Sequence, residues 1–272
     1  MATTITRRGF LASGVAAAAA LKFRPAFAED DQAAWREVRE FLFQDRPVLD
    51  GGEFVKIEAP VRPANGGDVS VRIVPAAPQK ADYFIRKHYL VVDKNPSPVG
   101  GVFTLSPRNG TAEIGTRIRV NEYSHVRVIS ETNRGELYMN KAFVKASGGC
   151  SAPPMDNDPM AKLKMGRMEL ARKGAGDGDA HGFQLSVLHP NNSGMQMDQI
   201  SMLFIPPHYI ETVEIANADG EQVFAVKGDI TFSQNPSFDF SYKPKRAGDI
   251  LQAKAVDSRQ KTYTATWPVS SA

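Results

Sequence analysis

Val69-Ser70-Val71-Arg72-Ile73-Val74 gives the clearest indication of fold class in this chain of 272 residues. Apolar β-branched side chains alternate with polar ones, so every second residue would face the same side of an extended backbone. An amphipathic helix would instead need apolar residues three and four positions apart. The stretch therefore predicts a β-strand with one buried face.

Comparable runs recur along the rest of the chain. Residues 116–120 and 125–129 alternate in the same way, 89–92 is a continuous apolar run, and 137–145 ends this first series. A second series follows at 182–188, 201–205, 211–217, 221–226, 238–242, 250–256 and 261–267. Asp219-Gly220 between two of these runs is a hairpin signal. Short strands separated by turn residues predict an all-β protein built from two β-sandwich domains.

Two short helices are expected beside the strands. Trp35, Val38 and Leu42 would share one face of a helix near the N-terminus. Residues 160–172 could form a second helix, because Asp158-Pro159 has the pattern of a helix start. The glycine-rich residues 173–179 have the composition of a flexible linker between the two sandwiches.

The first 28 residues have the pattern of an export signal. Residues 6–11 contain a twin-arginine pair, an apolar run covers 10–21, and Ala26-Phe27-Ala28 is a small-x-small cleavage site. The apolar run is too short to span a bilayer. We expect export to a bacterial periplasm by the twin-arginine route, with an ordinary secretory signal as the alternative.

The charge balance argues against a polyanionic partner. The chain has 33 basic and 30 acidic residues. Arg7, Arg8, Lys22 and Arg24 lie in the expected signal, which holds no acidic residue, so removing it lowers the formal charge from +3 to −1. We therefore expect no nucleic-acid partner and no binding to an anionic membrane.

Cys150 is the only cysteine. It lies in residues 147–154, where glycines, other small residues and two prolines disfavour a helix or a central strand. In an oxidising compartment a single thiol has no intramolecular disulfide partner. We expect an exposed, reactive thiol, with a buried structural cysteine as the alternative. No histidine or acidic residue stands beside it in the sequence, so we interpret it as a carrier group and the chain as a non-enzyme.

Two groups of residues in the sequence could bind a metal ion. Met155, Met160, Met165 and Met168 follow the cysteine, and thioethers with a thiolate suit Cu(I), although methionines also fill irregular gaps in cores. The histidines lie at 88, 125, 181, 189 and 208, with no metal-ligand spacing between any two. We expect no metal and no other cofactor, and a Cu(I)-binding protein remains an alternative function.

Short motifs in both halves carry a family resemblance. In the first half they are 57–60 with Asn65-Gly66, 93–96, 116–119 and Gly148-Gly149-Cys150. In the second half they are His189-Pro190, 205–206 with 209–210, 223–224, 235–236 with Phe238 and Phe240, and Gly248-Asp249. The first set resembles SoxY, the sulfur-compound carrier of bacterial thiosulfate oxidation, and the second resembles its partner SoxZ.

The resemblance implies a domain plan. Both families have immunoglobulin-like β-sandwich folds, which agrees with the strand pattern. We predict a twin-arginine signal at 1–28, a SoxY-like sandwich at 29–147, a cysteine arm and linker at 148–180, and a SoxZ-like sandwich at 181–272.

The resemblance also implies a function. Cys150 would hold the sulfur compound covalently on a flexible arm formed with Gly148, Gly149 and Ser151, and would present it to periplasmic sulfur-oxidation enzymes. Fused versions also occur beside quinoprotein dehydrogenase systems, so a non-covalent adaptor of such a dehydrogenase is a further alternative. In the family the arm ends the chain, whereas here it is tied at both ends. An exposed Cys150 would also allow a disulfide-linked dimer.

Overall fold

The structure is a computed structural model that describes residues 26–154, 163–175 and 179–269. Most of the predicted signal lies outside these ranges. The first half contains α1 (Ala26–Phe43), β1 (Val48–Asp50), β2 (Val55–Glu58), β3 (Val69–Pro75), β4 (Ile85–Val92), β5 (Val99–Leu105), β6 (Ile114–Ile118), β7 (Ser124–Thr132) and β8 (Leu137–Val144). The second half contains β9 (Met168–Ala175), β10 (His181–Val187), β11 (Ile210–Asn217), β12 (Gln222–Gly228), β13 (Ser237–Tyr242), β14 (Ile250–Asp257) and β15 (Thr262–Pro268).

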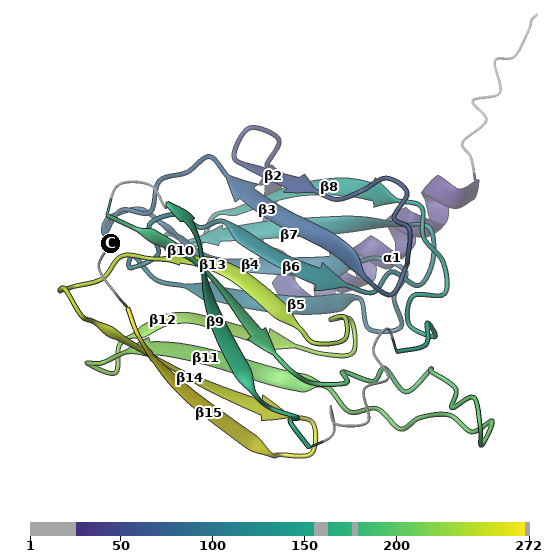
Figure 1. The fold of residues 1–272 in the computed structure, drawn as a ribbon. Helices are drawn as coiled ribbons and strands as arrows, with labels where there is room; N and C mark the ends of the chain where they lie inside the picture. The colour runs from purple at the N-terminus through teal and green to yellow at the C-terminus, as the bar shows by residue number, and fades with distance from the viewer. Residues whose placement is uncertain (1–25, 155–162, 176–178, 270–272) are drawn as a thin grey trace, which may run out of the picture.

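The strands form two stacked sheets (Figure 1). One sheet has nine strands in the order β1-β8-β7-β4-β5-β12-β11-β14-β15, and the other has six in the order β2-β3-β6-β13-β10-β9. In β3 the odd-numbered residues 69, 71 and 73 are buried while Ser70 and Arg72 are exposed, as the alternation predicts. The all-β prediction with two immunoglobulin-like sandwiches is confirmed.

The two halves join through both sheets. β5 of the first half pairs antiparallel with β12 of the second, with Phe103 opposite Val226, and β6 pairs with β13, with Thr116 opposite Phe238. One continuous hydrophobic core runs between the sheets through both halves. The halves are therefore held by backbone ladders and a shared core, which is a closer union than a linker alone would give. The domain boundaries at residues 147 and 180 stay a prediction.

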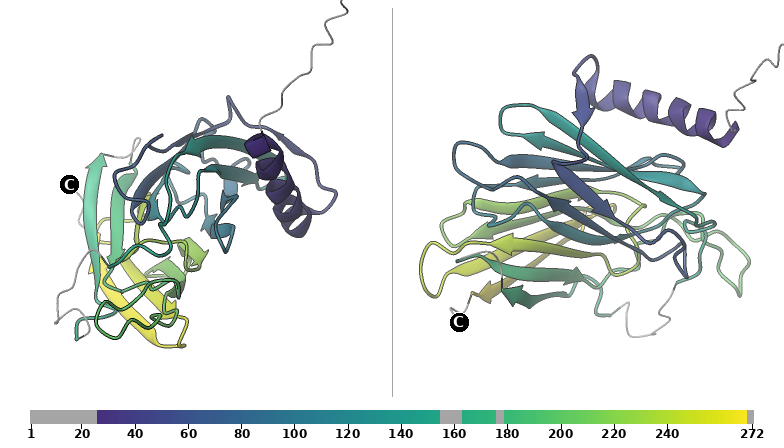
Figure 2. Two further views of the ribbon diagram at one scale, coloured as in Figure 1. Left: turned by 90° about the vertical axis from the view of Figure 1, so that its right-hand side faces the viewer. Right: turned by 90° about the horizontal axis from the view of Figure 1, so that it is seen from above.

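Helix α1 lies on the outer face of the nine-stranded sheet (Figure 2). Trp35, Val38 and Phe43 pack against residues of β4, β7 and β8, and Leu42 lies against the same cluster, so the predicted apolar face is confirmed. The Trp35 ring also covers the guanidinium of Arg127, 4.8 Å from the ring centroid. No helix in the described part of the chain is both long and apolar enough to cross a membrane.

Three predicted elements were wrong, one of them the start of the flexible linker expected at 173–179, because residues 173–175 belong to β9. Residues 168–172 were expected to be helical, but they belong to β9, which pairs with β10 at the edge of the six-stranded sheet. Met168 and Leu170 alternate with charged residues, and pairing with β10 outweighs the helix propensity of this stretch. The earlier part of that helix, 160–162, lies outside the described residues.

Residues 201–205 form no strand, although one was predicted there. Asp198 organises a turn in its place, because its side chain accepts hydrogen bonds from the backbone N–H groups of Ile200 and Ser201.

Candidate carrier site

The residues that follow β8 form a loop, 147–153, which we call the carrier loop. The N–H of Gly148 donates to the carbonyl of Asn121 at 2.8 Å, and the N–H of Gly149 donates to the carbonyl of Val120 at 3.1 Å. The N–H of Cys150 points at the side-chain oxygen of Asn121 at 3.4 Å. Gly148 has φ +68, a left-handed conformation that glycine adopts without strain. The carrier loop is therefore tied to the segment that follows β6.

Gly149 is needed for a second reason. A Cβ at this position would overlap the Gly66 carbonyl and lie 2.5 Å from the Val120 carbonyl oxygen. Gly66 is itself crowded, since a Cβ there would lie 2.9 Å from the Ser147 carbonyl oxygen. The Asn65-Gly66 turn and the Gly148-Gly149 pair, which are far apart in sequence, thus form one tightly packed contact.

The second half of the chain covers the carrier loop. The Ser193 hydroxyl donates a short hydrogen bond to the Cys150 carbonyl, and the Gln196 side chain donates to the Ala152 carbonyl at 2.9 Å. Cys150 has no exposed surface. The prediction of an exposed thiol was wrong, because residues more than forty positions later in the chain close over it.

Burial also controls the acidity of this thiol. It raises the pKa of Cys150 to about 11, with a smaller contribution from the charge of Asp229, while the positive charge of Arg119 opposes the rise. Thiolates are the nucleophiles in sulfur exchange. In the described conformation, Cys150 is therefore a protonated and unreactive thiol at neutral pH.

Residues from three of the resemblance motifs meet at this loop. The Asn95 side chain accepts from the Asn121 N–H at 2.9 Å and donates to the Arg119 carbonyl at 2.8 Å. The Gly66 carbonyl accepts from the Val120 N–H at 2.8 Å. The Asn95 and Asn121 side chains form hydrogen bonds here in place of the backbone pairing, which ends with β6. They position residues 119–121, which we call the strand exit, and the carrier loop packs against it.

Both halves of the chain match known protein families. Residues 39–150 match the family of the sulfur oxidation protein SoxY, and residues 168–268 match that of the sulphur oxidation protein SoxZ. The chain therefore belongs to the SoxY and SoxZ families, joined in one polypeptide. The SoxY match ends at Cys150, the residue at the centre of this site. Proteins of these families act as carriers in sulfur oxidation and work with its enzymes, and they are generally periplasmic.

Solved structures give weaker likenesses. The sulfur carrier protein SoxY from Chlorobium limicola f thiosulfatophilum is 21% identical, with a TM-score of 0.37 over 44% of this chain and 96% of that one. A superoxide reductase (neelaredoxin) from Ignicoccus hospitalis is 20% identical, with a TM-score of 0.30 over 35% of this chain and 80% of that one. Fibronectin(III)-like modules of Clostridium thermocellum CbhA are 12% identical, with a TM-score of 0.23 over 79% and 92%. No curated protein sequence matches the chain.

The SoxZ half contributes the segment 192–208, which we call the cover loop. Backbone bonds between Asn192 and His208 close its base, and Ser193 and Gln196 reach the carrier loop from its first residues. Its far end protrudes from one end of the molecule (Figure 1) and exposes large apolar side chains, with Ile200 95% exposed and Met202, Leu203 and Phe204 also exposed. An apolar surface of this kind is typical of a protein contact site.

Sequence reasoning missed a buried histidine pair at the base of the cover loop. His189 and His208 lie with their Nε2 atoms 3.3 Å apart, and Nε2 of His208 lies 2.9 Å from a carboxylate oxygen of Asp257. Burial would raise the pKa of Asp257, but hydrogen bonds from His208, Tyr263 and nearby backbone lower it to about 2. Burial lowers the pKa of His189 to about 4. No spacing in the sequence links these three residues, because they lie after β10, before β11 and at the end of β14.

The same three side chains have donor atoms close enough to hold a metal ion. The N–H of Asn191 donates to Nδ1 of His189 at 3.1 Å, however. A neutral histidine that binds a metal through Nε2 keeps its proton on Nδ1, where it would meet this donor. We therefore interpret the group as a hydrogen-bonded anchor for the cover loop.

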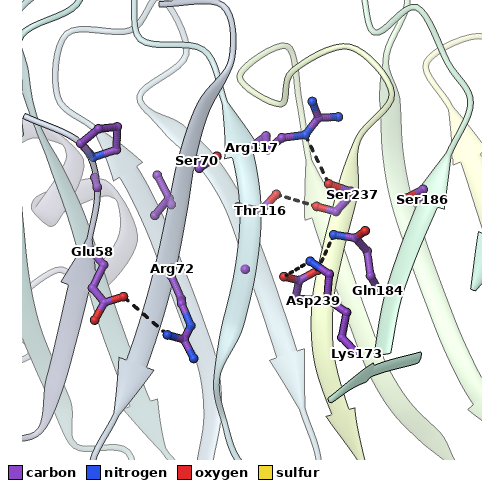
Figure 3. Close-up of a pocket in the computed structure, with 14 residues that line it drawn as sticks. Glu58, Ser70, Arg72, Thr116, Arg117, Lys173, Gln184, Ser186, Ser237 and Asp239 are labelled. Carbon is purple, nitrogen blue, oxygen red and sulfur yellow. Dashed lines mark hydrogen bonds and ion pairs between the residues drawn. The ribbon is translucent and has the colours of Figure 1, made fainter. Parts of the chain in front are cut away.

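A shallow groove of about 630 Å³ lies on the outer face of the six-stranded sheet and crosses the SoxY–SoxZ junction (Figure 3). Its charges pair with each other: Arg72 with Glu58 at 3.7 Å and Lys173 with Asp239 at 3.1 Å. Cys150 does not line it. The groove is therefore separate from the carrier site.

The described methionines do not support the copper alternative. Met168 is buried in β9 as part of the core, and Met165 lies in the preceding turn. Met155 and Met160 lie outside the described residues.

Proposed function

We propose that this SoxYZ protein is a periplasmic carrier that holds a sulfur-compound intermediate covalently on Cys150. The single observation that supports this most directly is that the only thiol lies at the end of the SoxY match and is enclosed by both halves. A structural cysteine would need neither the glycine contact beneath it nor the hydrogen-bonded cover above it. The chain itself would catalyse nothing and would depend on partner enzymes for loading and unloading.

The carrier loop would work as a gate. When it is closed, burial keeps the thiol protonated and unreactive. Opening requires the loss of a few hydrogen bonds, those of Gly148, Gly149, Cys150 and Ala152, and no strand has to separate. Gly148, Gly149 and Ser151 would be the residues that change conformation. Because the loop is tied at both ends, the sulfur would be raised to the surface locally and would not swing far from the molecule.

Partner enzymes would contact the protruding end of the cover loop. Its exposed apolar residues lie on the same segment that bonds to Cys150 and Ala152, so docking there would place an enzyme beside the thiol and disturb its cover. Sulfur-oxidation enzymes are the partners that the family indicates, and a quinoprotein dehydrogenase system is the other candidate. A disulfide-linked dimer through Cys150 would also require the carrier loop to open.

The test is intact-mass analysis of the protein purified from its host after rapid acid quenching. We expect an adduct on Cys150 during growth on a reduced sulfur compound, reversed by a thiol reductant. A Cys150→Ser strain should lose the associated growth. If no adduct is found and the Cys150→Ser strain grows normally, the covalent carrier role is wrong and the non-covalent adaptor is favoured.

A further inference from the structure

Arg119 is a buried charge that the gate does not require. It follows β6 directly and is 2% exposed. Its Nη1 donates to the Phe232 carbonyl at 2.6 Å, but its Nε atom has no hydrogen-bond partner. In the described part of the chain no carboxylate lies within ion-pairing distance of Arg119, and Asp68, which attracts it, is already paired with Arg117 at 3.0 Å. Burying a cation without a counter-ion is unfavourable, so an unused guanidinium needs an explanation.

The surroundings of Arg119 indicate what it could bind. Its positive charge lowers the pKa of Cys150 and so favours the anionic form of the thiol. A cavity of about 10 Å³ lies under the carrier loop and is lined by Asn65, Gly67, Arg119, Ala152, Pro153 and Gln234. This space is about that of one water molecule. The unsatisfied cation thus lies at the boundary between the strand exit and the loop that carries the thiol.

A second unsatisfied group lies one residue after Phe232, the residue that accepts the bond from Arg119. In the described residues, Ser233 Oγ is the other buried side-chain atom without a hydrogen-bond partner. Ser233 follows Phe232, whose carbonyl accepts the bond from Arg119. Buried polar groups are nearly always satisfied, so these two unsatisfied side chains need an explanation, and a bound polar ligand is one that would satisfy both.

We propose that Arg119 is the anion-binding residue of the carrier site and pairs with the negatively charged end of a sulfonate-type group attached through sulfur to Cys150. This inference rests on the proposed function, since it assumes a cargo on that cysteine. A guanidinium matches an oxyanion in both charge and hydrogen-bond geometry. A neutral cargo would gain nothing from it, so the site selects oxidised, anionic sulfur over alkyl or neutral sulfane groups.

The size of the cavity adds one condition. A sulfonate is larger than a water molecule, so Ala152 and Pro153 must move outward when the cargo is held. The strand exit need not move, because Arg119 is fixed there by its own backbone bonds to Thr231 and Asn95. The loaded protein would therefore keep its charged cargo against Arg119 with the carrier loop partly raised.

The inference can be tested on the full chain with two chemical adducts. With tetrathionate, the Cys150 thiolate attacks an inner sulfur, a new S–S bond forms and thiosulfate leaves, which gives Cys150–S–S–SO3⁻. With methyl methanethiosulfonate, methanesulfinate leaves and the neutral Cys150–S–S–CH3 forms. Labelling in mild denaturant followed by refolding gives access to the buried thiol, and intact mass confirms each adduct.

The thermal unfolding midpoints of both adducts are then compared in three proteins. In the wild type the anionic adduct should unfold at the higher temperature. In Arg119→Met this advantage should disappear, a change of roughly 3–5 °C, which corresponds to about a tenfold change in the unfolding equilibrium. Arg119→Lys should keep at least half of it. The Arg119→Met change leaves no orphaned acceptor, because the Phe232 carbonyl also accepts from the Asn191 side chain at 2.7 Å.

Three results would overturn the inference. The first is an anionic adduct of the wild-type protein whose thermal midpoint is no higher than that of the neutral adduct. This result would not require any variant. The second is an equal advantage in wild type and Arg119→Met, and the third is an Arg119→Lys protein that loses as much as Arg119→Met, which would indicate packing instead of charge. Because the adducts are made chemically, these outcomes are independent of whether the host loads Cys150, so they are distinguishable from a failure of the proposed function.

Discussion

Cys150 combines two properties that conflict for a reactive residue. A nucleophilic thiol is normally partly exposed and has a lowered pKa, whereas this thiol is buried and has a raised one. The conflict disappears if the described conformation is the resting state. A carrier in an oxidising compartment gains from a sulfur that reacts only after its loop opens, because uncontrolled oxidation or disulfide exchange would consume it.

The raised pKa predicts how stability depends on pH. The folded protein holds the Cys150 proton more tightly than the unfolded chain, whose ordinary value is 9.0, so the stabilisation is complete below pH 9 and is lost as the pH rises towards about 11. The loss should be on the order of 2 kcal/mol. Urea unfolding of wild type and Cys150→Ser between pH 8 and 11 measures it as the difference between the two curves. Parallel curves would show that the folded state does not hold the proton.

Gly149 gives a second prediction for a single residue. Alanine at this position would overlap the Gly66 carbonyl and force the carrier loop away from the strand exit. We expect Gly149→Ala to react with iodoacetamide at least tenfold faster at pH 8, since a displacement costing roughly 1.4 kcal/mol changes the open population by that factor. Gly52→Ala is the matched control, because the nearest atom to its added Cβ would be 3.5 Å away. Equal rates in the two variants would contradict the packed-loop account.

The cover loop is the element that connects the SoxZ half to the thiol. Two side chains near its base, Ser193 and Gln196, bond to the carrier loop, while its far end is apolar and exposed. The histidine pair and Asp257 fix the base against β14 and the strand that follows. If partner enzymes dock at the far end, as proposed, the same loop connects their contact site to the residues that cover Cys150.

Removing the cover bonds should make the thiol accessible without unfolding the protein. We expect the Ser193→Ala/Gln196→Ala double variant to be alkylated roughly five- to 100-fold faster, because two bonds of about 0.5–1.5 kcal/mol each are lost. The thermal midpoint should fall by only a few degrees, since two hydrogen bonds are lost but no core residue is altered. Ser201→Ala in the same loop is the control, because that hydroxyl bonds only to the nearby Asp198. A double variant that reacts like this control would show that the two bonds do not hold the gate.

The elements show which features of this structure are visible in the sequence. Strands such as β3 and β13 follow from strict alternation, and the β11–β12 hairpin follows from Asp219-Gly220. β9 was missed because Met168-Glu169-Leu170-Ala171 suits either a helix or an edge strand, and only pairing with β10 selects the strand. The motifs predict Cys150 as the carrier residue, but give no sign of its burial, which depends on Gly66, Ser193 and Gln196. Contacts of such long sequence separation have no local signal.

At the scale of the whole molecule, the two halves share their sheets and their hydrophobic core. The Phe103 ring of β5 lies 6.1–6.3 Å from the rings of Phe224, Phe232 and Phe238, all in the SoxZ half. Phe232 packs over Gly101 and Gly228, which face each other across the β5–β12 junction and leave room for its ring. The junction is thus an aromatic core and not a surface contact. The carrier site lies at the end of this junction and depends on both halves keeping their positions.

This arrangement predicts that the two halves unfold together. The chain has two tryptophans, Trp35 on α1 and Trp267 on β15, so Trp35→Phe and Trp267→Phe give proteins in which fluorescence reports on one half at a time. Both should show the same urea midpoint. Phe103→Ala, a change in the SoxY half, should lower both urea midpoints equally, because it reduces the free energy of unfolding by about 3–5 kcal/mol. Tyr123→Ala, at an exposed position, should change neither midpoint. If Phe103→Ala shifted only the Trp35 signal, the halves would be independent domains, and the enclosure of Cys150 would have to be explained by the cover loop alone.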